Sequence, residues 1–79
     1  MSRLPRISGK GTIQKLKGLG FEVFDQSGSQ VYLHKWDDEQ NNWSQRVTVP
    51  VHGNKTLKLG TLKSILRQAE ISVEQFSRG

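Results

Sequence analysis

The sequence predicts one α+β domain in the order α-β-β-β-α, with a three-stranded antiparallel sheet and the helices on one of its faces. Apolar and polar residues alternate from residue 30 to 36 and again from 45 to 50, which is typical of half-buried strands. From residue 59 to 69 the apolar residues instead recur every three or four positions, which predicts an amphipathic helix. Because the strands follow one another along the chain, they are expected to pair as an antiparallel meander.

The N-terminal part of the chain predicts a first helix and a first strand. Ser8 is a suitable N-cap for the helix. The apolar side of this helix carries Ile13, Leu16 and Leu19. Gly20 suits the left-handed position just after a helix. Residues 21–24 then begin a strand, and the polar residues 26–29 form the turn that follows it.

The second and third strands are expected at residues 30–36 and 45–50. In the second strand, Val31 and Leu33 point toward the core. The opposite face of this strand carries Gln30, Tyr32, His34 and Trp36. Pro50 ends the third strand, because proline has no N–H to donate to the ladder.

A polar and acidic connection, residues 37–42, joins these two strands and is framed by Trp36 and Trp43. Two tryptophans in this position are expected to pack across the hairpin. They could also serve as platforms for nucleobases or as an anchor for a protein partner. Since the connection is negatively charged, we do not expect it to touch RNA.

The C-terminal part of the chain has the strongest helical pattern. Its apolar stripe carries Leu59, Leu62, Ile65, Leu66 and Ala69. Ser72 and Gln75 fit a capping box for a final short helix. In the core, the second and third strands are expected to pack against the helices. The sheet contributes Val31, Leu33, Val47 and Val49, and the helices contribute Leu16, Leu62, Ile65 and Leu66.

Length and composition predict a small domain without disulfide bonds. The 79 residues correspond to one domain, 1–79, with its core at about 8–76. The chain has no cysteine, which excludes disulfides and thiolate zinc sites, and we expect no metal and no cofactor. There is no apolar run of the secretory type and no stretch of roughly 20 apolar residues, so a cytoplasmic protein without membrane contact is expected.

The positive charge is unevenly distributed along the chain. The net charge is +5, and it divides into +4 for residues 1–23, −3 for residues 24–43 and +4 for residues 44–79. If the two basic ends fold together, they form a positive face that favours a polyanion such as nucleic acid. A charge of this size is also compatible with simple solubility.

Five short motifs follow one another between residues 8 and 76. They are Gly20-Phe21, Gly28-Ser29, Val47-Thr48-Val49-Pro50-Val51-His52, Gly60-Thr61-Leu62 and Ile65-Leu66-Arg67-Gln68-Ala69. In this order and spacing they resemble the HicA family of toxin–antitoxin ribonucleases, whose fold resembles the double-stranded RNA-binding domain. The resemblance implies a cytosolic endoribonuclease that cleaves mRNA, and a HicB-type antitoxin that covers its active face. No helix-turn-helix spacing is present, so no DNA contact is expected for this chain alone.

One residue departs from the family pattern. The family has Gly-Ser-His at the second strand, with the histidine catalytic, whereas this chain has Gly28-Ser29-Gln30. A glutamine amide does not titrate near neutral pH, so the resemblance implies a ribonuclease that is silent as written. Either the chain descends from a toxin that lost its activity, or the histidine was replaced so that a host tolerates the protein. The alternative is a non-catalytic module that binds RNA or only its antitoxin.

The remaining site residues form two predicted sets. For RNA binding we expect Lys10, Lys17, His52, Lys55, Lys58, Lys63 and Arg67. For the antitoxin interface we expect Tyr32, His34 and Trp36. His34 lies four residues beyond Gln30, or roughly 13 Å along a strand, which is too far to replace the missing base.

Overall fold

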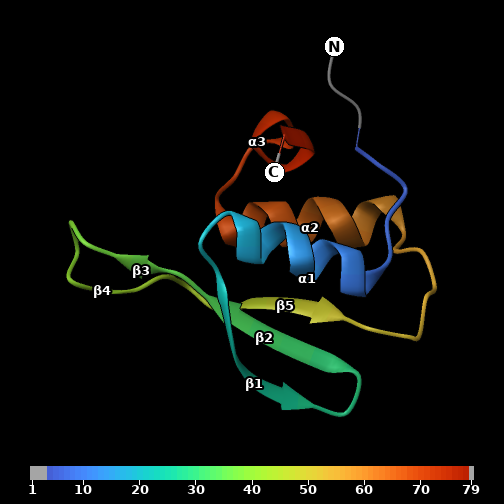
Figure 1. Ribbon diagram of the computed structural model, residues 1–79, viewed down its shortest axis with the longest axis horizontal. Coiled ribbons are helices and arrows are strands. Elements are labelled where there is room, and N and C mark those ends of the chain that lie inside the picture. The colour runs from blue at the N-terminus through green and yellow to red at the C-terminus, as the bar shows by residue number, and fades with distance from the viewer. Residues whose placement is uncertain (1–3, 79) are drawn as a thin grey trace.

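The computed structural model describes residues 4–78. The elements in chain order are α1 (Gly9–Gly18), β1 (Glu22–Ser27), β2 (Gln30–His34), β3 (Trp36–Asp37), β4 (Asn42–Trp43), β5 (Val47–Pro50), α2 (Leu59–Ala69) and α3 (Val73–Arg78). The arrangement confirms the predicted α+β fold, similar to a double-stranded RNA-binding domain (Figure 1).

The main sheet contains three antiparallel strands in the order β1-β2-β5. Val31 pairs with Val49 and Leu33 with Val47, so both apolar pairs lie on the same face of the sheet. This register is the one expected from the alternation of apolar and polar residues. The strand bounds differ from the prediction, since β1 extends to Ser27 and β5 begins only at Val47.

The predicted second strand is interrupted at Lys35. The backbone N–H of Lys35 donates to the side-chain oxygen of Ser44 over 2.9 Å, while the N–H of Ser44 donates to the carbonyl of Lys35 over 2.7 Å. Because the N–H of Lys35 is bound to a side chain, β2 ends and a separate hairpin, β3–β4, begins. In this hairpin Trp36 pairs with Trp43, and the ring centroids are 5.3 Å apart in an edge-to-face arrangement. The predicted packing of the two tryptophans is confirmed.

Helices α1 and α2 lie together on one face of the sheet (Figure 1). All eight residues expected in the core are buried: Leu16, Val31, Leu33, Val47, Val49, Leu62, Ile65 and Leu66. Leu59 differs from the prediction, since 45% of it is exposed at the first turn of α2. The apolar stripe of this helix therefore begins at Leu62.

Helix α3 packs over the other two helices on the side away from the sheet (Figure 1). Phe76 anchors it and is fully buried in the core. The ammonium group of Lys15 donates to the carbonyl of Phe76 over 3.2 Å and lies 5.4 Å from the centroid of its ring. The predicted capping box is present, with reciprocal hydrogen bonds between Ser72 and Gln75 of 2.8 and 3.1 Å.

The start of α1 lies directly against the end of β5. Ser8 caps the helix as predicted, because its hydroxyl oxygen accepts from the N–H of Gly11 over 3.1 Å. Gly9 is buried, and a Cβ added there would collide with the carbonyl oxygen of Pro50. This close approach fixes the position of the loop that leaves β5. Across residues 4–78, no helix is long and apolar enough to cross a membrane.

Candidate functional site

A groove runs between the end of strand β5 and helix α2. Its first part is lined by Gln30, Thr48, Pro50, Gly60, Thr61, Ser64, Ile65 and Gln68. Gln30 reaches it from β2, where it pairs with Pro50. The side chain of Gln68 holds the helix to the strand, because its oxygen accepts from the N–H of Thr48 over 2.9 Å.

This part of the groove contains uncharged polar groups. Within residues 4–78, the amide of Gln30 and the hydroxyls of Thr61 and Ser64 make no hydrogen bond to the protein. Gln30 and Thr61 are half-buried and Ser64 is exposed. These groups can therefore donate to and accept from a ligand. We call this part the neutral end of the β5–α2 groove.

The second part of the groove is basic, and we call it the cationic end. It is lined by Pro50, His52, Lys55, Thr56, Leu57, Lys58 and Thr61. Pro50 and Thr61 line both parts, so the two ends adjoin. A tight turn forms this end: the N–H of Lys55 donates to the carbonyl of His52 over 3.0 Å, and Gly53 has a φ of 57°. A phosphate is the ligand that this end would attract most strongly.

The structure thus divides the predicted RNA-binding residues. His52, Lys55 and Lys58 lie together at the cationic end. Lys63 and Arg67 are exposed on α2, and Lys10 is exposed on α1, and none of these three lines the groove. Lys17 lines a separate hollow beside β1. Of the four basic residues predicted between residues 55 and 67, only Lys55 and Lys58 therefore line the groove.

The outer face of the sheet carries a row of aromatic side chains. Its members, in spatial order, are Phe24, His34, Trp43 and Trp36. The imidazole of His34 is stacked between two rings, with centroids 4.2 Å away for Phe24 and 3.7 Å for Trp43. Phe24, Trp43 and Trp36 are 42–46% exposed. Both faces of the His34 ring are thus covered, so a nucleobase would find no free face on this imidazole.

Tyr32 lies beside the aromatic row rather than within it. The ring centroids of Tyr32 and Phe24 are 6.4 Å apart, and the guanidinium of Arg46 lies 4.8 Å from the centroid of Tyr32. The three residues predicted for the antitoxin interface, Tyr32, His34 and Trp36, therefore belong to one aromatic surface. Sequence reasoning missed Phe24 and Arg46 as parts of it, because the pairing of β1 and β5 with β2 was needed to place them.

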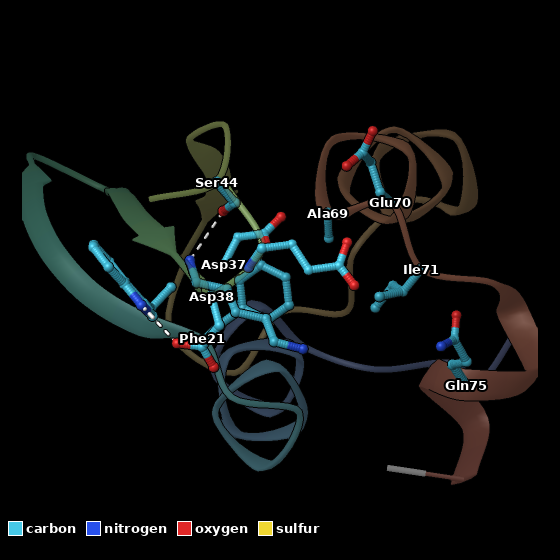
Figure 2. Close-up of a pocket in the computed structure, with 11 residues that line it drawn as sticks. Phe21, Asp37, Asp38, Ser44, Ala69, Glu70, Ile71 and Gln75 are labelled. Carbon is cyan, nitrogen blue, oxygen red and sulfur yellow. Dashed lines mark hydrogen bonds between the residues drawn. The ribbon is translucent and has the colours of Figure 1, made fainter. Parts of the chain in front are cut away.

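A second, acidic hollow lies between the β3–β4 hairpin and the connection from α2 to α3. Four carboxylates line it, from Asp37, Asp38, Glu39 and Glu70, together with a single ammonium group from Lys35. Figure 2 shows Asp37 and Asp38 on one side and Glu70 and Ile71 on the other. This acidic hollow and the β5–α2 groove share no lining residue. A polyanion is therefore attracted to the groove and repelled by the hairpin.

The sequence model of one protein family, described as HicA toxin of bacterial toxin-antitoxin, matches residues 9–71. The chain belongs to the HicA toxin family. The match begins with α1 and ends just after α2, so both ends of the groove and the whole aromatic row lie within it. No curated protein is similar enough to the chain to count as a match.

Membership of the HicA toxin family defines the general role of the protein. It is a toxin of the toxin–antitoxin type, and an antitoxin is its general class of partner. Gln30 lines the neutral end of the groove. Of the other residues predicted for the site, only three line the same groove as Gln30: His52, Lys55 and Lys58.

Proposed function

We propose that this HicA toxin family member is the RNA-binding scaffold of an mRNA-cleaving endoribonuclease. This form of the protein does not cleave RNA, because Gln30 replaces the catalytic histidine. The observation that supports the proposal is the position of Gln30 in the same groove as a basic cluster, His52, Lys55 and Lys58. RNA cleavage needs a proton-transfer group beside the sugar and positive charge beside the phosphate, and the groove offers a place for both.

The chemistry explains why one residue decides the activity. Attack of the 2′-hydroxyl on the neighbouring phosphorus forms a new P–O bond and breaks the bond to the 5′-oxygen. The 2′-hydroxyl loses a proton and the departing 5′-oxygen gains one, so a group that titrates near neutral pH is needed. The amide of Gln30 donates and accepts hydrogen bonds at nearly the same reach but takes up no proton. Binding can therefore survive where catalysis is lost.

The aromatic surface of the sheet is proposed as the docking site of a HicB-type antitoxin. Aromatic side chains are enriched at protein interfaces, and three rings of the row are more than two-fifths exposed. Tyr32, His34 and Trp36 would lie in this interface. Because both faces of the His34 ring are already covered, this ring presents only its edge, which suits the packing of a protein better than the stacking of bases.

A second candidate is a non-catalytic module that binds RNA or only its antitoxin. Gln30 itself favours it, since a natural glutamine would leave the groove as a binding site alone. The native gene separates the two candidates. A histidine codon at position 30 beside a HicB-like reading frame supports the ribonuclease, and a natural glutamine without such a neighbour supports the module.

The decisive experiment is Gln30→His, with Gln30→Asn as the matched control. Restoring an imidazole is expected to raise RNA cleavage by about 10²–10⁴-fold over the Gln30 form and to arrest growth when the protein is induced. Gln30→Asn has no titrating group and should stay silent. Co-expression of a HicB-type partner should suppress the arrest. If the folded Gln30→His protein leaves RNA intact and cells growing, the ribonuclease proposal is wrong.

A further inference from the structure

The neutral end of the groove contains more hydrogen-bonding groups than the cleavage chemistry needs. Thr61 and Ser64 are three residues apart on α2, and Gln68 follows Ser64 by four, so all three lie on the helix side that lines the groove. The hydroxyls of Thr61 and Ser64 have no partner within residues 4–78. Neither a proton transfer nor a phosphate contact requires two neutral hydroxyls at this place.

We propose that the neutral end is a ribose-selecting subsite. The nucleotide bound there has its phosphate at the cationic end, and Thr61 and Ser64 hydrogen-bond the 2′-hydroxyl of its ribose. The inference rests on the proposed function in taking single-stranded RNA as the ligand. It goes beyond that function in assigning the choice of RNA over DNA to two residues of α2.

The arrangement of the groove supports this assignment. Sugar and phosphate alternate along a nucleic acid strand, and here an uncharged hydrogen-bonding surface adjoins a basic one. Pro50 and Thr61 line both ends, so the two surfaces adjoin as a sugar and its phosphate do. The hydrogen bond from Thr48 to Gln68 keeps α2 at a fixed distance from the strand, so the subsite does not need to assemble on binding.

The chemistry of the neutral end matches a hydroxyl better than a charged or apolar group. A 2′-hydroxyl is both a donor and an acceptor, as are the hydroxyls of Thr61 and Ser64. A site that hydrogen-bonds a hydroxyl discriminates against the analogue that lacks it, because its polar groups then lose their partner. Since Ser64 is exposed and Thr61 half-buried, water replaces part of the lost contact and the discrimination is modest.

The other polar surfaces do not offer the same discrimination. In the aromatic row the imidazole of His34 is covered on both faces, at 4.2 and 3.7 Å, so no nucleobase can stack on this imidazole. The acidic hollow repels the phosphates of a strand through its four carboxylates. The groove is thus the surface to which a test of sugar selectivity applies.

The test measures equilibrium binding of the protein with Gln30 in place, which under the proposed function leaves RNA uncut. Single-stranded RNA and DNA oligomers of one sequence are titrated by fluorescence anisotropy at two salt concentrations. RNA is expected to bind about 3–30-fold more tightly than DNA, as one or two added hydrogen bonds imply. Thr61→Val combined with Ser64→Ala should bring this ratio to about 1 by weakening RNA alone, without changing the salt dependence.

The matched control changes the cationic end. Lys55→Ala combined with Lys58→Ala should weaken RNA and DNA by the same factor, keep their ratio and reduce the salt slope by about 1.4. Lys63→Ala combined with Arg67→Ala, on the outer side of α2, should change both affinities less. Far-UV circular dichroism and urea unfolding establish that each variant is folded.

A second measurement needs no variant of the protein. A set of RNA oligomers, each with a single 2′-deoxy nucleotide, is titrated against the unchanged chain, and one position should lose affinity while its neighbours do not. Equal affinity for RNA and DNA, or a ratio that survives Thr61→Val with Ser64→Ala, overturns the subsite and leaves the proposed function standing. If RNA does not bind at any salt concentration, both the proposed function and the subsite are wrong.

Discussion

The side-chain oxygen of Gln68 accepts a hydrogen bond from the backbone N–H of Thr48, with 2.9 Å between the two atoms. Strand β5 is an edge of the sheet, so on this side no further strand is available to that N–H. A side chain of α2 supplies the acceptor instead and ties the helix to the edge of the sheet. Both residues of this contact line the neutral end of the β5–α2 groove.

The first prediction concerns the stability that this hydrogen bond contributes. Gln68→Met keeps the length of the side chain but removes the acceptor, which leaves the half-buried N–H of Thr48 unsatisfied. The free energy of unfolding is expected to fall by about 1–2 kcal/mol, measured by urea unfolding. Gln68→Glu keeps an oxygen acceptor and should lose less. Equal stability of Gln68→Met and the unchanged chain would show that the bond contributes nothing.

The second prediction compares the same substitution at two glycines of α1. Gly9→Ala places a Cβ against the carbonyl of Pro50, so α1 or the end of β5 must shift. A loss of about 1–3 kcal/mol in the free energy of unfolding is expected. Gly18→Ala meets no atom within 4 Å and should instead stabilise the protein by about 0.5–1 kcal/mol. Effects of the same sign in the two variants would contradict the packing of α1 on β5.

Much of this fold could be predicted because the signals are local. Alternation fixes which face of β2 is buried, and Val31 and Leu33 show it with no knowledge of the rest of the chain. The capping residues Ser8 and Ser72 act within one helical turn, and both predictions are confirmed. Core packing then follows, since α1, β2, β5 and α2 each bury one side.

The site could be predicted only in part, because it depends on contacts between distant segments. The stack of Phe24 on His34 requires the pairing of β1 with β2, and this ladder contains a shift between Val23 and Asp25 that the sequence does not indicate. The capping box predicted α3, but it did not indicate that Phe76 is fully buried, which follows from the packing of α3 against α1. Net charge along the chain identified basic segments, but not which lysines face the groove.

The third prediction concerns the aromatic row and compares its two tryptophans. Trp43 contacts both His34 and Trp36, whereas Trp36 contacts Trp43 and donates from its indole N–H to Asp38 over 2.9 Å, at the exposed tip. Trp43→Ala is therefore expected to lower the free energy of unfolding more than Trp36→Ala, by about 0.5–1.5 kcal/mol for the additional pair. Both variants remove the coupling of the two indoles in near-ultraviolet circular dichroism. Equal losses of stability would mean that the stack on His34 is not stabilising.

The fourth prediction is the pH dependence of cleavage by the Gln30→His variant. If the introduced imidazole acts as the base, only its neutral form takes the proton of the 2′-hydroxyl. Cleavage should therefore be low at pH 5, rise as the imidazole loses its proton and level off above about pH 8. The rate of cleavage of a short RNA from pH 5 to 9 measures this profile. A rate that does not depend on pH would exclude the introduced imidazole as the base.

The chain has two further histidines, and their positions separate them from the introduced imidazole. His34 is enclosed between Phe24 and Trp43 on the outer face of the sheet, so His34→Ala in the Gln30→His background should lower cleavage less than restoring glutamine at position 30, and should leave the midpoint in place. His52 lines the cationic end of the groove, whereas Gln30 lines the neutral end. His52→Gln in the Gln30→His background should therefore leave the rising limb and its midpoint in place, because the rising limb belongs to the imidazole at position 30 alone.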